Sequence, residues 1–98
     1  MANITLQKNK WLVSGDVLMH NAGEILNQSN DFLMAHVIEI DFSAVADVDT
    51  VALSLMMEWQ RRAIVANGKV TFAHLPANLA SLAALYGVTD FIPLNKSH

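Results

Sequence analysis

The run Asp47-Val48-Asp49-Thr50 holds the residues best suited to chemistry, two carboxylates and a hydroxyl in close succession. A long helical pattern follows directly, so Thr50 is its predicted N-cap and the two aspartates lie near the positive end of the helix dipole. Capping by itself accounts for these residue types. The same pattern leaves Thr50 exposed beside a loop, a setting typical of phosphorylation sites and of contacts with a partner protein.

The run from Asp47 to Thr50 gives little support for a catalytic function. Thr50 has no neighbouring base in the sequence that would make it a nucleophile, and the chain contains no glycine-rich phosphate loop. Asp47 and Asp49 would act as an acid and base pair only if their surroundings raised the pKa of one of them, and solvated caps are far more common. We therefore predict that the protein is not an enzyme and binds no cofactor.

The histidines offer no metal site. Their spacing matches no metal-binding pattern, and the chain contains no cysteine to complete one. We predict that no metal is bound and that the histidines are ordinary surface or strand-end residues: His20, His36, His74 and His98.

The composition is that of a small globular protein. The 98 residues suffice for one domain, predicted over residues 1–98, and 53% of them are hydrophobic whereas 15% are charged. A net charge of −3 with only six Lys and Arg residues creates the wrong field for binding nucleic acid. The absence of cysteine fits a reducing cytosol, and the chain shows neither a secretion signal nor a stretch of about 20 apolar residues. We predict a cytoplasmic protein that associates with a membrane only through a partner.

Hydrophobic periodicity predicts a hairpin and a helix in the first third of the chain. Alternation around a polar break indicates a β-hairpin over residues 4–14. Helical spacing then predicts a first helix over residues 22–34, with Asn21 and Glu24 as a capping box.

Strands and helices continue to alternate after this helix. Period-two alternation predicts a strand over 36–42, followed by a polar connection over 43–49. A long helix over 50–66, a short strand over 69–73 and a helix over 76–86 complete the order β-β-α-β-α-β-α. This order predicts an α/β fold with a mixed, roughly four-stranded sheet, helices mainly on one face and right-handed crossovers.

The long second helix is more apolar than one sheet contact requires. Its apolar arc spans roughly 200° on a helical wheel, against the ~100° that a helix buries on a sheet. Neighbouring helices are expected to cover most of the difference. Met and Trp are also favoured at binding surfaces, so Met56, Met57 and Trp59 are either core residues or contacts for another protein.

Several stretches resemble a known family. A resemblance to the STAS domains appears in Ile40-Asp41-Phe42-Ser43 and in Val48-Asp49-Thr50-Val51-Ala52-Leu53. In these domains an Asp followed by Ser or Thr opens the second helix. A closer resemblance to the MlaB branch than to the anti-sigma factor antagonists appears in Asn67-Gly68-Lys69-Val70, Leu75-Pro76 and Leu85-Tyr86-Gly87-Val88. The resemblance covers nearly the whole chain and implies a single STAS-like domain.

The resemblance to MlaB implies a protein partner. MlaB-like proteins are cytoplasmic subunits of an ABC-type complex that moves phospholipid between the inner and outer bacterial membranes, and they bind its ATPase subunit. By this likeness Thr50 lies in or beside the surface that faces the ATPase, and the chain is peripheral to the inner membrane through that subunit. The predicted partner-binding residues are Asp49, Thr50, Val51, Ser54 and Met57.

Two other functions stay open. In phospho-regulated STAS proteins a partner kinase phosphorylates the position of Thr50, so the chain is alternatively an anti-sigma factor antagonist switched at Thr50. Val51-Ala52 departs from the small residues that many family members carry there, which makes close approach of a kinase less favourable. Some STAS domains bind nucleotides or small lipids, and a sensor of such a ligand is the third function considered.

Overall fold

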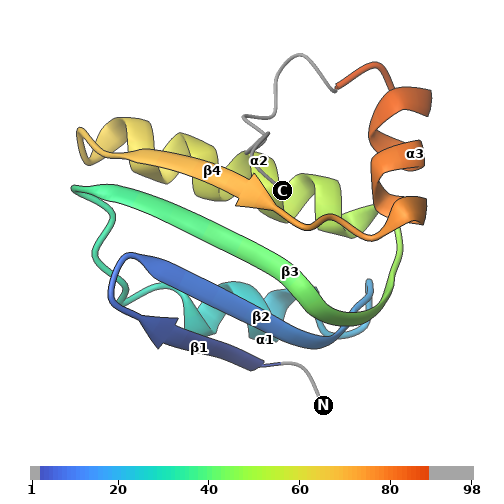
Figure 1. Ribbon diagram of the computed structural model, residues 1–98, viewed down its shortest axis with the longest axis horizontal. Coiled ribbons are helices and arrows are strands. Elements are labelled where there is room, and N and C mark those ends of the chain that lie inside the picture. The colour runs from blue at the N-terminus through green and yellow to red at the C-terminus, as the bar shows by residue number, and fades with distance from the viewer. Residues whose placement is uncertain (1–2, 89–98) are drawn as a thin grey trace.

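Residues 3–88, the part of the chain that this computed structural model describes, fold into four strands and three helices in the predicted order (Figure 1). The strands are β1 (Asn3–Gln7), β2 (Lys10–Val17), β3 (Val37–Val48) and β4 (Lys69–Ala73). The helices are α1 (Ala22–Gln28), α2 (Val51–Val65) and α3 (Ala77–Leu85). Residues 1–2 and 89–98, the latter including the fourth histidine, His98, lie outside the described residues.

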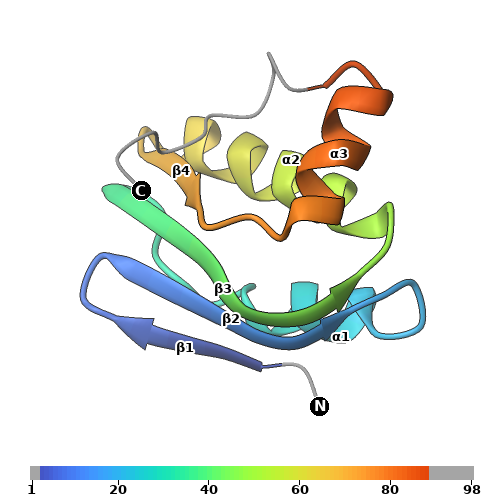
Figure 2. The same ribbon diagram turned by 45° about the vertical axis from the view of Figure 1, so that its right-hand side comes forward.

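The four strands form one mixed sheet in the order β1-β2-β3-β4. β1 and β2 form an antiparallel hairpin, whereas β3 runs parallel to β2 and β4 runs parallel to β3. Figures 1 and 2 show α1 and α2 on the same face of this sheet, and α3 packs beside α2. The predicted α/β architecture is therefore confirmed. Because β2, β3 and β4 are parallel, their carboxyl ends meet at one edge of the sheet, where α2 begins.

β3 is longer than the sequence indicated. The stretch 43–49, predicted as a polar connection, continues the strand to Val48. It pairs in parallel with β2 as far as Val17, with two register shifts that leave extra residues on β3. Such bulges bend a strand, and β3 curves toward its end in Figure 1. The prediction was wrong because pairing with a distant strand, which the local pattern does not contain, stabilises this stretch.

α1 is shorter than the sequence indicated. The helix predicted over 22–34 ends at Gln28 and is followed by a turn. In this turn the Phe32 amide donates a hydrogen bond to the Ser29 carbonyl at 3.1 Å. The succession of Ser, Asn and Asp after the helix favours a turn because these side chains compete with the helix for backbone hydrogen bonds.

The predicted capping box of α1 is also wrong. Asn21 precedes the helix, but its side chain makes no capping hydrogen bond, and Glu24 is exposed. The Asn21 Oδ1 atom instead accepts a hydrogen bond from the Leu18 amide, and its Nδ2 donates to the Asp16 carbonyl, both at 2.9 Å. Asn21 therefore braces the loop between β2 and α1.

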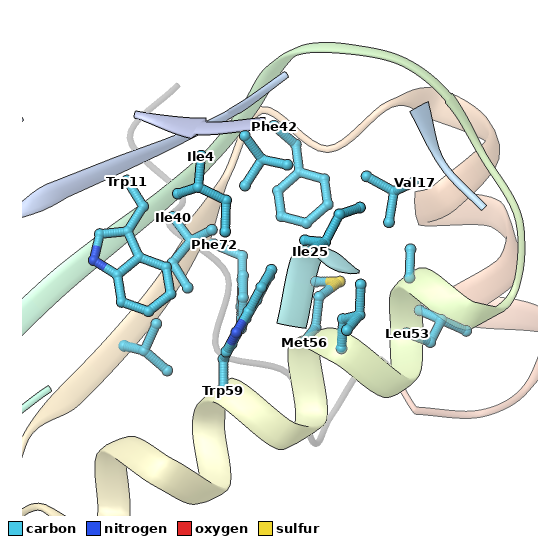
Figure 3. Close-up of a cluster of buried hydrophobic side chains, with 14 of the residues drawn as sticks. Ile4, Trp11, Val17, Ile25, Ile40, Phe42, Leu53, Met56, Trp59 and Phe72 are labelled. Carbon is cyan, nitrogen blue, oxygen red and sulfur yellow. The ribbon is translucent and has the colours of Figure 1, made fainter. Parts of the chain in front are cut away.

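The hydrophobic core lies between the sheet and α2, whose inner side chains meet those of the strands in Figure 3. Trp59 is fully buried at its centre, with its ring centroid 5.7 Å from that of Trp11 in an edge-to-face arrangement. The Trp59 Nε1 donates a hydrogen bond to the Ser29 hydroxyl at 2.9 Å. Met56 is fully buried as well, so the alternative of Met56 and Trp59 as partner contacts is wrong. Met57 is 44% exposed and stays at the surface.

One carboxylate is buried on the sheet. Asp41 of β3 accepts a hydrogen bond from the Ser43 amide at 2.7 Å and lies 3.0 Å from the Lys10 ammonium. Burial by itself would raise the pKa of Asp41, but these contacts outweigh it and hold the pKa below its ordinary value. The ion pair joins the hairpin to β3.

Glu58 of α2 binds two arginines of the following turn. Its carboxylate accepts hydrogen bonds from Arg61 at 2.9 and 2.7 Å and from Arg62 at 2.9 Å. The bonds from Arg61 and Arg62 lower the pKa of Glu58 to about 2. Glu58 is therefore ionised wherever the protein is folded near neutral pH.

Trp59→Ala should destabilise the fold strongly. The substitution removes a fully buried ring and leaves a cavity, so we expect a loss of about 3–5 kcal/mol in the free energy of unfolding, measured by urea denaturation. Met57→Ala on the exposed side of the same helix is the control and should cost no more than about 0.5 kcal/mol. Equal and small losses for the two variants would contradict the central position of the ring.

The stability of the protein should decline as the pH falls below 4.5. Because the folded state lowers the pKa of Glu58 from 4.5 to about 2, its ion pairs contribute fully above pH 4.5 and are lost as the pH falls through 2. In Glu58→Gln this part of the decline should be absent. Thermal unfolding followed by circular dichroism across this range measures both proteins, and identical pH profiles would contradict the role of Glu58.

Candidate partner-binding site

Thr50 lies exposed immediately before α2, and its hydroxyl makes no hydrogen bond with any described residue. A residue that caps a helix with its side chain has extended backbone angles, whereas Thr50 already has helical angles, with φ −62° and ψ −20°. Thr50 is the N-cap residue by position, as predicted, but its side chain does not cap the helix. Among the described residues, none takes up its hydroxyl.

Asp49 supplies the cap in place of Thr50. One of its carboxylate oxygens accepts a hydrogen bond from the Val51 amide at 3.0 Å, and the other accepts one from the Met19 amide at 2.9 Å. The Asp49 amide donates to the Val17 carbonyl at 3.2 Å. This single residue thus joins the end of β2, the loop before α1 and the start of α2, and it fixes Thr50 relative to Met19.

The five predicted partner-binding residues come together on one surface. Thr50, Ser54 and Met57 are four and three positions apart, so they form a stripe along one face of α2. All three are exposed, and Asp49 and Val51 are half-buried beside them. We call the three exposed residues the Thr50 stripe.

A shallow apolar depression opens on one side of the Thr50 stripe. Its volume is about 310 Å³, and it is bordered by Thr50 and Val51 together with Met19 and Tyr86. Met19 is 73% exposed and Tyr86 is 60% exposed. Large apolar and aromatic side chains gathered at the surface are typical of protein–protein contacts. We call this hollow the Thr50 depression.

Two members of this surface were not predicted from the sequence. Met19 and Tyr86 are far from Thr50 in the sequence, and no periodic pattern links the three residues. Tyr86 belongs to the run Leu85-Tyr86-Gly87-Val88, which served only as a mark of the family branch. No signal in the sequence points to Met19.

A second depression lies on the other side of the stripe, between α1 and α2. Its volume is about 330 Å³, and it is bordered by Gly23 and Leu26 of α1 and by Val51, Ser54 and Glu58 of α2. It shares Val51 and Ser54 with the Thr50 depression, so the start of α2 forms a ridge between two hollows. We call this second hollow the α1–α2 groove.

Neither a metal-binding cluster nor a membrane-spanning helix occurs among the described residues. Within residues 3–88 no three or more His, Asp or Glu side chains are arranged to hold a metal ion. In the same part of the chain no helix has the length and apolar character to cross a bilayer. What the surface offers is exposed apolar area around a hydroxyl that has no described hydrogen-bonding partner.

The sequence matches the family described as "Mlab, STAS domain" over residues 3–94. No curated protein matches it. Among solved structures, it is similar to a protein from Thermotoga maritima described as an anti-sigma factor antagonist, with a TM-score of 0.76 and 10% identity over 95% of this chain and 84% of that one.

Two further structures have the same fold. An anti-sigma factor antagonist from Mycobacterium paratuberculosis has a TM-score of 0.74 and 17% identity over 99% of this chain and 86% of its own. The anti-sigma factor antagonist SpoIIAA in its unphosphorylated form has a TM-score of 0.67 and 11% identity over 100% of this chain and 90% of its own. At these identities the likeness shows the fold alone. The match to the family over nearly the whole sequence shows more: the chain belongs to the STAS domain family, in its MlaB branch.

Proposed function

We propose that this chain is a non-catalytic adaptor subunit that binds the ATPase of an MlaB-type ABC complex for phospholipid transport. STAS domains are protein-interaction modules that generally lack catalytic activity. The adaptor would work in the cytoplasm, peripheral to the inner membrane through the ATPase, and support the lipid traffic that maintains outer-membrane asymmetry. The observation that carries the proposal is the Thr50 hydroxyl, which has no hydrogen-bonding partner within residues 3–88 and lies among exposed apolar side chains, in a member of the MlaB branch.

The proposed contact residues divide by their chemistry. Met57 and Val51 would lose apolar area to the partner, which contributes about 25 cal/mol for each Å² removed from water. Thr50 and Ser54 would exchange water for hydrogen bonds with the partner, which fixes the register of the two surfaces. Asp49 would act as a positioning residue, since its carboxylate oxygens are already occupied by backbone amides.

Thr50→Glu should leave the fold intact and weaken binding to the ATPase. A carboxylate at the start of α2 is compatible with the helix dipole, so folding tolerates it. The partner would have to desolvate that charge against the apolar side chains of the Thr50 depression. We expect the dissociation constant to rise at least about tenfold, measured by titration calorimetry with the purified ATPase of the same organism's phospholipid-transport complex.

Thr5→Glu on β1 is the matched control, because it places the same charge on an exposed threonine of the edge strand. It should bind the ATPase as the unmodified chain does. If the unmodified chain binds no ATPase, the proposed function is wrong. If the chain binds but Thr50→Glu binds equally well, the proposed site is wrong.

The same exposed hydroxyl favours a second function, an anti-sigma factor antagonist switched by phosphorylation at Thr50. Nothing among the described residues hydrogen-bonds the hydroxyl and so shields it from a kinase. A phosphate adds a charge of about −2, which the dipole at the start of α2 tolerates but which an acidic or apolar partner face would repel. Structures of similar fold carry the description of anti-sigma factor antagonists.

Mass spectrometry of the intact chain from cells grown under varied stress tests this second function. If it operates, a fraction of the chain should carry one added phosphate, and fragmentation should locate it on Thr50. An unmodified chain under every condition would remove the main support for the switch.

A further inference from the structure

Gly23 is a glycine that the described fold does not require. It lies in the first turn of α1, where glycine destabilises a helix relative to alanine because it loses more backbone entropy on folding. Its φ is not positive, and a Cβ added at Gly23 would meet no atom within 4 Å. Gly68 provides the contrast, because a Cβ there would collide with the Met34 carbonyl. A reason for Gly23 is therefore to be sought outside the described residues.

Gly23 borders the α1–α2 groove. The other residues at this border include Leu26 of α1 and Val51 and Leu55 of α2, so its walls are mainly apolar. Without a side chain at Gly23, another backbone can approach α1 closely. A groove between two helices fits the row of apolar side chains that a third helix presents at every third or fourth position.

The end of the molecule that holds the groove is acidic. Asp16 and Asp47 are register partners on β2 and β3, which places their Cα atoms ~4.8 Å apart, and Asp49 follows two positions later. The carboxylates that form ion pairs among the described residues are those of Glu39, Asp41 and Glu58. No described cation therefore forms an ion pair with Asp16, Asp47 or Asp49. The described lysines lie at the opposite end, in the hairpin turn and at the starts of strands: Lys8, Lys10 and Lys69. Arg61 and Arg62 lie beside the groove, where both are paired with Glu58.

The nearby carboxylates and the apolar walls of the groove together indicate which kind of partner fits it. Neighbouring carboxylates repel one another, and a cationic partner relieves that repulsion. A second copy placed face to face on the groove would bring the same carboxylates together, and an anionic lipid surface would also be repelled. We propose that the α1–α2 groove receives an apolar helix of the ATPase whose residues nearest Asp16, Asp47 and Asp49 are basic. This inference rests on the proposed function and specifies the surface of the ATPase that is bound.

Gly23→Leu tests the groove. The added side chain would fill the hollow without meeting described atoms at its Cβ, so the variant should fold with a thermal midpoint equal to that of the unmodified chain or a few degrees higher. We expect the dissociation constant for the purified ATPase to rise at least about tenfold. Asn27→Leu is the matched control, because it adds the same side chain to an exposed position of α1 outside the groove, and it should bind normally.

Asp16→Asn/Asp47→Asn tests the charge of the occupant. Binding of the unmodified chain to the ATPase should weaken as salt is raised, because salt screens attraction between opposite charges. In the double variant this dependence on salt should be smaller, while the thermal midpoint should be equal or higher since a repulsion has been removed. An unchanged dependence on salt would overturn the assignment of a basic helix.

The variants distinguish a failure of the groove proposal from a failure of the proposed function. Weaker binding of the ATPase by both Thr50→Glu and Gly23→Leu supports the proposed function and the groove as its binding surface. Weaker binding by Thr50→Glu with normal binding by Gly23→Leu overturns the groove and leaves the function standing. No binding by the unmodified chain overturns both. Self-association of the chain without the ATPase, measured by analytical ultracentrifugation and abolished by Gly23→Leu, would assign the groove to a second copy and overturn the proposal.

Discussion

The orientation of α2 about its own axis determines which of its side chains form the surface of this protein. Leu53, Met56 and Trp59 are buried against the sheet or its neighbours, and the Trp59 ring is held by its hydrogen bond to Ser29. Each residue turns an α-helix by about 100°, so a change of one position would pull this ring from the core. With the buried row fixed, the Thr50 stripe must face outward.

The Thr50 hydroxyl makes no capping hydrogen bond because another residue caps the helix. The Asp49 carboxylate accepts hydrogen bonds from the amides of Val51 and Met19. The Val51 amide, at the start of α2, is therefore already satisfied. The same pair of hydrogen bonds holds Met19, 73% exposed, beside the helix. One carboxylate thus orders the apolar rim of the Thr50 depression, and the neighbouring Thr50 hydroxyl is not needed to cap α2.

The surface around the start of α2 is poorly suited to an isolated protein. It exposes Met19 and Tyr86 to water and gathers carboxylates such as Asp16 and Asp47 on adjacent strands without a described cation. An apolar, cationic partner surface of the kind proposed would cover the exposed apolar area and relieve the repulsion between the carboxylates. Natural proteins commonly accept such local costs at functional sites. The stability of the fold comes instead from the core beneath α2.

The sequence by itself determined the elements whose patterns are local, and the tertiary structure decided the rest. Alternation and helical spacing predicted the hairpin, β4, α2 and α3, and the motif around Asp49 and Thr50 indicated the family and the region of the site. The end of β3 was mispredicted because a distant strand determines it. The early end of α1 was mispredicted because the turn-forming residues from Ser29 onward outweigh the helical spacing of the apolar residues. The sequence left open which residues of the apolar arc are core, and only the fold buried Trp59 and exposed Met57. The physical reason is that burial and pairing depend on atoms far away in the chain, which only folding brings into contact.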